Sequence, residues 1–216
     1  PEAVARAVEV FEADCDPDHH VDVRMWGSDT ALTLGYGPPP PGFTPDPGAD
    51  WTTYTVRYPS TLVAEGTRFE LLTAPEAALR QSDGLLGLVA RAGAGDLICV
   101  EQLYERPHWG DPVSAPNLRI QSYLDAARRG ARVRVLLNGG TFDTASMSLT
   151  QNIEAAATLN EIAGAEGLDL SAHLGDPTRY GIHNKMVLVD LGAEGKYVHV
   201  GSLNGSETSS KINREM

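Results

Sequence analysis

Two side chains of this sequence, His183 and Lys185, combine residue types and a spacing that suit chemistry on a phosphate group. They lie in an apolar stretch, residues 182–190, whose pattern predicts a β-strand. Side chains two residues apart on a strand point to the same face, so the imidazole and the ammonium group would lie side by side. The lysine charge favours neutral imidazole, which is a competent nucleophile toward phosphorus, and both groups can bind an anion.

The same alternation assigns the remaining side chains of this strand to the opposite face. Ile182, Met186 and Leu188 would point away from the histidine into apolar packing. Asp190 also falls on that face by parity. We therefore interpret Asp190 as a structural or supporting group of the candidate catalytic set, rather than one in direct contact with the reacting atoms.

A second polar group follows the next predicted strand, where Ser202 and Asn204 would again share one face. Their hydroxyl and amide groups could hold a phosphate oxygen or orient a neighbouring imidazole. Glu215 lies eleven residues after Asn204. A carboxylate that accepts a hydrogen bond from a histidine ring fixes the tautomer of that ring. Taken separately, each pattern is also typical of an ordinary polar turn or strand end.

Together these residues resemble the motifs of the phospholipase D superfamily. The matching residues are His183, Lys185 and Asp190 in its HxKxxxxD signature, Ser202 and Asn204 in its GSxN element, and Glu215 on the following strand. The resemblance covers residues 66–216. One departure is a longer separation between Asp190 and Gly201, and the turn-like residues 191–195 predict a longer hairpin there.

The resemblance implies a mechanism and a set of roles. In the family, a histidine of one half attacks phosphorus and forms a phosphohistidine, while the histidine of a second half protonates the leaving alcohol. It implies that His183, Lys185 and Asp190 are catalytic, and that Ser202 and Asn204 bind or support the phosphate. Glu215 has a supporting role by the same resemblance. Neither a metal nor a cofactor is implied.

The chain contains a single HxK motif, because none of its other histidines is followed by lysine two residues later. A second half must therefore come from elsewhere. We favour a missing first half of the same polypeptide, since residues 2–14 predict an amphipathic helix that resembles the closing helix of a preceding half. The alternative is a homodimer of single-motif chains. The first residue is proline, and residues 212–216 read as an unfinished strand. Both observations suggest that the sequence is part of a longer chain.

Three functions remain open at this point. The first is a phosphodiesterase that hydrolyses phospholipids or exchanges their head groups, with a phosphodiester, favoured to be a phospholipid, as substrate. The second is a nuclease on the same scaffold, and the third is a non-catalytic interaction module. Acidic residues number 29 against 17 lysines and arginines, for a net charge of −12. This balance disfavours a stable nucleic-acid complex, because such binding depends on phosphate neutralisation.

Strands and helices alternate from residue 66 onward, which predicts an α/β fold. We expect strands at residues 69–72, 97–104, 132–137, 168–173, 182–190 and 196–202, and helices near 82–92, 117–129 and 149–164. The crossovers favour parallel pairing first and antiparallel pairing where the last connections shorten. The predicted domain is a mixed β-sheet flanked by helices, one phospholipase D-like half.

The first 65 residues have a different character. Residues 1–20 would be the closing helix of a preceding half. Residues 21–65 form a predicted β-rich, proline-rich linker segment, with four consecutive prolines at 38–41. Residues 66–216 are the predicted HKD domain.

Composition excludes some classes of protein. Hydrophobic residues make up 42% and charged residues 21% of the chain, as in globular proteins, and no apolar run reaches the length of a membrane span. Cys15 and Cys99 match no zinc or redox spacing. The cellular location stays open, with a secreted or cell-surface location favoured over a cytoplasmic one.

Overall fold

The computed structural model divides the chain into two units that are described separately, Pro1–Leu71 and Leu72–Met216. The predicted linker segment of residues 21–65 lies outside the residues that the structure describes. Those residues are 2–14, 66–110, 115–139, 147–175 and 181–216.

The described part of the first unit contains one helix, α1 (Glu2–Asp14). It forms where the apolar periodicity predicted a helix. Val4, Val8 and Phe11 of its apolar stripe are exposed. The role of α1 as the closing helix of a preceding half, and the domain boundaries at residues 21 and 66, stay predictions.

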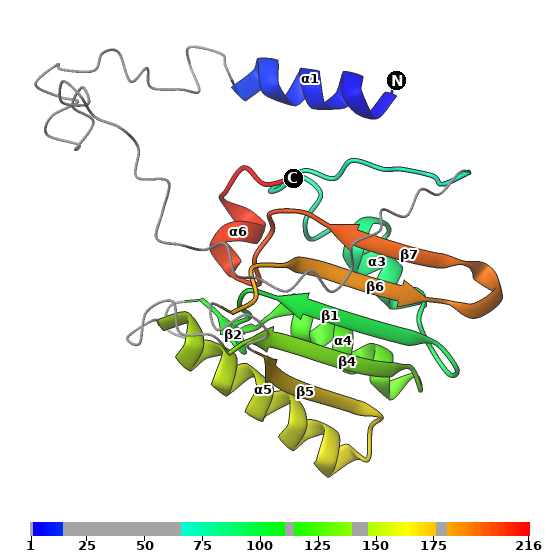
Figure 1. Cartoon of the computed structure of the whole chain (residues 1–216), viewed down its shortest axis with the longest axis vertical. Helices are drawn as coiled ribbons and strands as arrows, with labels where there is room; N and C mark the ends of the chain where they lie inside the picture. Colours follow the sequence, from blue (N-terminus) through cyan, green and yellow to red (C-terminus); the bar gives the residue numbers. More distant parts are fainter. Residues whose placement is uncertain (1, 15–65, 111–114, 140–146, 176–180) are drawn as a thin grey trace, which may run out of the picture. The chain divides into compact units, whose positions relative to one another are not determined.

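The second unit is built on a mixed five-stranded sheet with the strand order β5-β4-β1-β6-β7 (Figure 1). Its strands are β1 (Leu97–Gln102), β4 (Arg132–Asn138), β5 (Leu170–Gly175), β6 (Lys185–Asp190) and β7 (Lys196–Val200). β4 pairs parallel with both β1 and β5, whereas β6 pairs antiparallel with β1 and β7. The predicted change from parallel to antiparallel pairing is confirmed.

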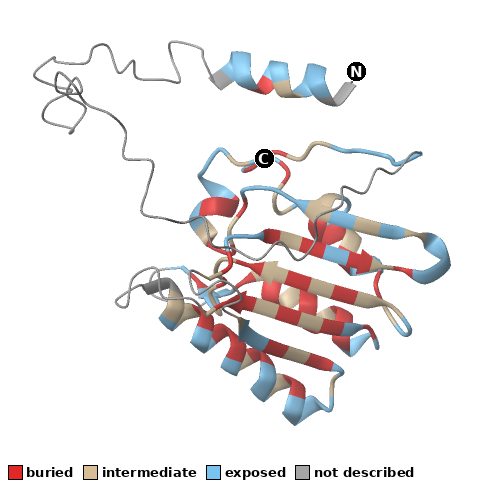
Figure 2. Ribbon diagram, viewed as in Figure 1, coloured by how far each residue is buried: buried red, intermediate tan, exposed pale blue. Residues whose placement is uncertain are grey.

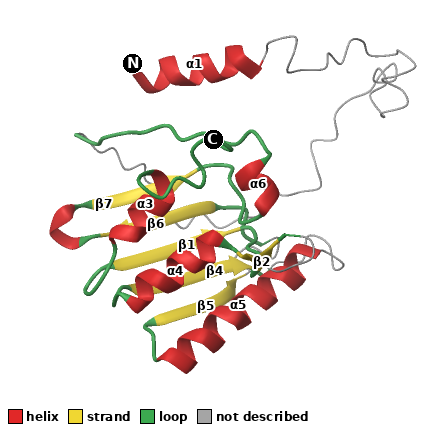
Figure 3. Ribbon diagram, turned by 180° about the vertical axis from the view of Figure 1, so that it is seen from behind, coloured by secondary structure: helices red, strands yellow, loops and turns green. Residues whose placement is uncertain are grey.

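Three helices cover one face of this sheet (Figure 3). They are α3 (Gly84–Arg91), α4 (Leu118–Arg128) and α5 (Met147–Glu166). Their buried side chains form one apolar core with alternate residues of the strands, such as Val100, Val135 and Val187. The predicted fold class, a mixed sheet flanked by helices, is therefore confirmed. None of the helices among the described residues is long and apolar enough to cross a membrane.

No helix of the described part of this unit covers the opposite face of the sheet, as Figures 1 and 3 show. Side chains there are half-buried or exposed, in contrast to the buried residues of the helix side (Figure 2). A hollow of about 260 Å³ on this face is lined by residues that include Cys99, Glu101, Arg134 and Met186.

Local sequence signals explain the limits of α4. The side-chain oxygen of Asn117 accepts a hydrogen bond from the backbone N–H of Arg119 and caps the first turn. Gly130 follows the helix with a φ of 95°, a conformation that glycine adopts without strain. At α3, Asp83 occupies the N-cap position without a side-chain hydrogen bond to the first turn.

Two sequence expectations about strands are wrong. Residues 69–72 form no strand, and nearby pairing is limited to an isolated bridge between Ala74 and Glu215. Residues 212–216 do not begin a strand at Ile212, because this residue follows the short helix α6 (Glu207–Lys211). A short apolar run does not form a strand without a neighbour that pairs with its backbone.

Candidate active site

The imidazole of His183 and the ammonium group of Lys185 lie side by side. Nζ of Lys185 is 3.3 Å from Nδ1 and 3.5 Å from Nε2 of His183, and it donates a 2.8 Å hydrogen bond to the carbonyl oxygen of His183. His183 is exposed, whereas Lys185 is only 8% exposed. A solvent-facing imidazole next to a fixed cation can meet an anionic substrate.

The backbone on both sides of His183 is fixed by neighbouring strands. Oδ1 of Asn138, at the end of β4, accepts a 2.8 Å hydrogen bond from the N–H of Ile182. Gly181 has a φ of 86°, and a Cβ at this position would lie 2.0 Å from the same oxygen, so only glycine fits. After His183, the carbonyl of Asn184 accepts a hydrogen bond from the N–H of Leu103, just beyond β1.

The buried face of β6 differs from the prediction. Lys185 shares the helix-covered face with Val187 and Val189, whereas Met186 is half-buried and Leu188 is 37% exposed on the opposite face. Ile182 is buried as expected, but it precedes the strand. Both faces of β6 carry apolar residues, so alternation alone could not show which face the helices cover.

The pKa of Lys185 is affected by burial and by a neighbouring carboxylate. Burial of its side chain, the larger effect, lowers the pKa of Lys185, and the negative charge of Glu215 opposes this shift. Glu215 is half-buried and accepts hydrogen bonds from Oγ of Ser209 at 3.2 Å and Nδ2 of Asn213 at 3.4 Å. Within the described residues it makes no hydrogen bond with His183, so its electrostatic partner here is Lys185.

Ser202 and Asn204 follow β7 near the start of β6. Register and backbone bonding place the two strand ends together, since Gly201 N donates to the carbonyl of Lys185. Oγ of Ser202 is hydrogen-bonded to the backbone of Met216. Oδ1 of Asn204 is buried and has no hydrogen-bond partner among the described residues. Leaving such a buried acceptor unpaired costs about 1–3 kcal/mol.

The structure does not bring Asp190 to this group. It ends β6, so about 17 Å of strand, at about 3.3 Å per residue, separates it from Lys185. Its carboxylate accepts hydrogen bonds from Nζ of Lys196 and, at 3.0 Å, from the N–H of Gly192, and these contacts lower the pKa of Asp190. These contacts place Asp190 at the turn of the β6–β7 hairpin, and its catalytic role stays a prediction.

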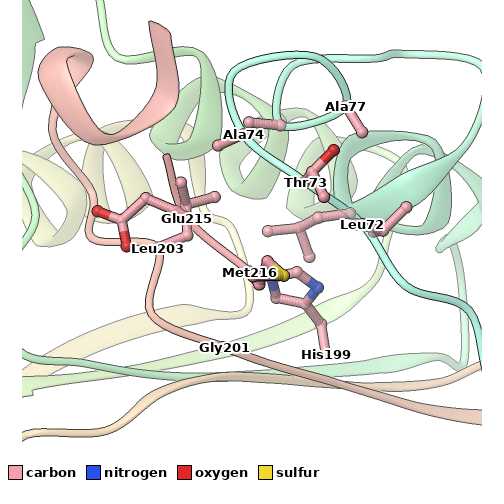
Figure 4. A pocket seen from close by; sticks show the side chains of 11 residues that line it. Leu72, Thr73, Ala74, Ala77, His199, Gly201, Leu203, Glu215 and Met216 are labelled. Carbon is pink, nitrogen blue, oxygen red and sulfur yellow. The ribbon is translucent and has the colours of Figure 1, made fainter. Parts of the chain in front are cut away.

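A cavity of about 20 Å³ lies close to these elements (Figure 4). Its lining includes Leu72, Thr73, His199, Leu203 and Glu215. This volume accommodates about one water molecule, so the cavity is too small to hold a phosphodiester. Burial, with a smaller contribution from the charge of Arg119, lowers the pKa of His199 to about 4.

A group of buried polar residues contacts the loop of residues 201–206, and the sequence did not mark them as functional. Glu105 and Arg119 form an ion pair in which both side chains are 1% exposed. Nδ2 of Asn117 donates to Oε2 of Glu105 at 2.9 Å. Gln102, directly opposite Lys185 in the register, is fully buried. The sequence gives one weak signal for this group, because Gln102 is a polar residue at the end of an apolar strand. No local sequence pattern indicates the ion pair of Glu105 and Arg119.

No group of three or more metal-binding side chains occurs within the part of the chain that the structure describes. The predicted metal-free reaction remains a prediction.

The chain is similar to several known proteins. Residues 112–216 match the family model of the phospholipase D-like domain of cardiolipin synthase. A solved structure of Nuc, a phospholipase D family member from Salmonella typhimurium, matches with 21% identity and a TM-score of 0.40, over 66% of this chain and 75% of that protein.

A second solved structure, polyphosphate kinase from Porphyromonas gingivalis, matches with 17% identity and a TM-score of 0.41, over 67% of this chain and 22% of that protein. No curated protein sequence matches the chain. The family match begins before α4 and contains His183, Lys185 and Asn204. The resemblance predicted from the motifs is confirmed, since residues 112–216 match a phospholipase D-like domain.

Proposed function

We propose that this chain is one catalytic half of a phosphodiesterase that works through a phosphohistidine intermediate. The observation that carries the proposal is the exposed imidazole of His183, fixed 3.3 Å from the buried ammonium group of Lys185. Phosphoryl transfer depends mainly on positioning and charge neutralisation, and this pair can provide both.

The proposed reaction has two steps and requires two histidines, one from each half. In the first, a ring nitrogen of one histidine forms a bond to phosphorus while the bond to the leaving alcohol breaks, and the other histidine gives that oxygen a proton. In the second, the latter histidine removes a proton from water or another alcohol, whose oxygen attacks phosphorus and breaks the N–P bond. His183 can take either role.

Other residues would stabilise charge during these steps. Lys185 would neutralise the phosphoryl oxygens, and the amide of Asn204 would supply a hydrogen bond to them. The second half would come from a missing part of the same polypeptide or from a second copy of the chain.

A phospholipid is the proposed substrate class. The net charge of −12 disfavours a long polyanion, and the matching family model is that of cardiolipin synthase. Hydrolysis and transfer of a phosphatidyl group differ only in whether water or an alcohol enters in the second step.

The test is a substrate panel for the chain together with its second half: phosphatidylcholine vesicles, single-stranded DNA and a bis-aryl phosphate. We expect turnover of the lipid, complete loss of turnover in His183→Ala, and unchanged turnover in His173→Gln, which removes an exposed histidine of β5. Preferred cleavage of DNA would establish the nuclease. Wild-type kcat in His183→Ala, or no turnover of any substrate by the assembled protein, would refute the proposed reaction.

A further inference from the structure

Gly205, in the loop that carries Ser202 and Asn204, is bonded to the body of the domain through both of its backbone polar groups. Its N–H donates to the carbonyl of Tyr104 at 3.1 Å. Its carbonyl accepts hydrogen bonds from Nδ2 of Asn117 at 3.1 Å and from Nε1 of Trp109 at 3.4 Å. The residue next to Asn204 is thus held from three directions by groups about 90 to 100 positions away in the chain.

Glu105 explains why this position is a glycine. A Cβ on Gly205 would lie 2.0 Å from Oε2 and 2.1 Å from Cδ of Glu105. The φ of Gly205 does not fall in the range that favours glycine, so the requirement comes from close approach of the carboxylate. The same Oε2 accepts a hydrogen bond from Asn117, which therefore joins the loop carbonyl and the carboxylate.

A contribution to the stability of the fold does not by itself explain why Glu105 and Arg119 form a buried ion pair next to this loop. Glu105 and Arg119 are each 1% exposed, and their closest atoms, Oε1 and Nε, are 3.1 Å apart. Removing two charges from water costs several kcal/mol per ion, so a buried ion pair often stabilises a fold no better than apolar residues of similar size would. Its better-supported use is to define one arrangement of the groups around it.

We propose that Glu105, Asn117 and Arg119 are positioning residues that fix the loop of residues 201–206 so that Asn204 meets the phosphoryl group. The assignment rests on the proposed function. Arg119 forms an ion pair with the carboxylate of Glu105, and that carboxylate accepts a hydrogen bond from Asn117. Asn117 also donates to the carbonyl of Gly205, and the carbonyl of Tyr104 accepts from the N–H of Gly205. None of the three touches substrate.

Asn117→Asp tests this arrangement with little change in size. Aspartate keeps the oxygen that caps α4, but loses the N–H donor to Gly205 and places a second carboxylate against Glu105. The matched control is Asn160→Asp on α5. Asn160 exchanges two 2.8 Å hydrogen bonds with the backbone of Ala172 on β5, and the variant loses its N–H donor in the same way, at a position that does not contact the loop.

We expect Asn117→Asp to lower kcat by between about tenfold and a hundredfold, the range that a displacement of about 1 Å can produce. Inhibition by inorganic vanadate, a small phosphate-like anion, should weaken in parallel. Both measurements are made well below the unfolding temperature, so loss of stability alone does not change them. Asn160→Asp should lower the unfolding temperature and leave kcat and vanadate inhibition unchanged. Wild-type values in Asn117→Asp, or equal losses in both variants, would overturn the proposal.

A second pair of variants tests the contact between Glu105 and Gly205 directly. Gly205→Ala should lower kcat because its methyl group meets the carboxylate, and adding Glu105→Asp, which is one methylene shorter, should restore part of it. An absence of rescue would contradict the contact.

Hydrogen exchange at the amide of Gly205 separates the two proposals, because it needs no substrate. Faster exchange in Asn117→Asp but not in Asn160→Asp shows that the network holds the loop, whereas equal rates refute the inference. Absence of turnover by the assembled wild-type protein refutes the proposed function instead.

Discussion

Lys185 has an apolar stem in the core and a charged end at the histidine. This combination holds the ammonium group within 3.5 Å of both ring nitrogens of His183. A long side chain on the surface would lose conformational freedom on binding a phosphate, whereas a buried stem has already lost it. The position of the charge is therefore set before substrate arrives.

Lys185→Met should keep the packing and remove the charge. We expect the activation barrier to rise by about 3–4 kcal/mol, as for loss of one preorganised donor. The measurement is kcat, with Lys196→Met as the control, because Lys196 is an exposed lysine at the far end of the hairpin. An equal loss in both variants would contradict a specific role for Lys185.

His199 should make the stability of the domain depend on pH. Its pKa is about 4 in the folded protein and about 6.5 when unfolded, so between these values the unfolded chain binds more protons. Stability should therefore be fully present above pH 6.5 and fall as the pH drops toward 4, by up to about 3 kcal/mol at about 1.4 kcal/mol per pKa unit. Urea unfolding of His199→Gln should show a flatter profile than wild type or His173→Gln. An unchanged profile in His199→Gln would contradict the assignment.

Among the elements, the β6–β7 hairpin carries the candidate catalytic lysine at one end and structural contacts at the other. Lys185 begins β6 at one end, while Asp190 ends it at the turn that contains the 3₁₀ helix Gly192–Glu194. The long spacing between the HxKxxxxD and GSxN elements is accommodated at this turn, away from His183. The insertion therefore leaves the candidate site intact.

Asp190→Asn tests this division of roles. The variant should retain wild-type kcat, because the carboxylate contacts Lys196 and Gly192 rather than the site. Its stability should fall only slightly, since exposed ion pairs contribute little. A strong loss of kcat at unchanged stability would support a catalytic role for Asp190.

The sequence predicted elements well where the signal was local. Asn117 and Gly130 limit α4 through contacts within a few residues, and the periodicity of β1 and β4 follows from burial on one face. It predicted the wrong buried face for β6 because the choice depends on where helices pack. The network of Glu105 and Arg119 was missed because these two residues are more than ten positions apart and the network reaches the loop through the distant contact of Asn117 with Gly205.

For the whole molecule, a single histidine–lysine pair means that the proposed reaction is incomplete in one chain. The phospholipase D resemblance predicts a second half, and the described residues contain no second pair of this kind. The remaining histidines of the described part, such as His108 and His173, lie on other elements.

The isolated chain should therefore be inactive as a monomer. If two copies form the enzyme, activity per mole should rise with protein concentration and follow the fraction of dimer measured by light scattering. If a missing half is needed, activity should appear only when that half is added. Full activity of a demonstrated monomer would contradict both versions.

The thiol of Cys99 can report on access to the sheet face that none of the described helices covers. Cys99 lines the hollow there and has a free thiol, and the only other cysteine in the sequence, Cys15, can be replaced by serine. The rate at which a maleimide alkylates Cys99 then measures small-molecule access to that surface. Protection of the thiol during assembly would show that the partner covers this face, and no cysteine has to be introduced by mutation.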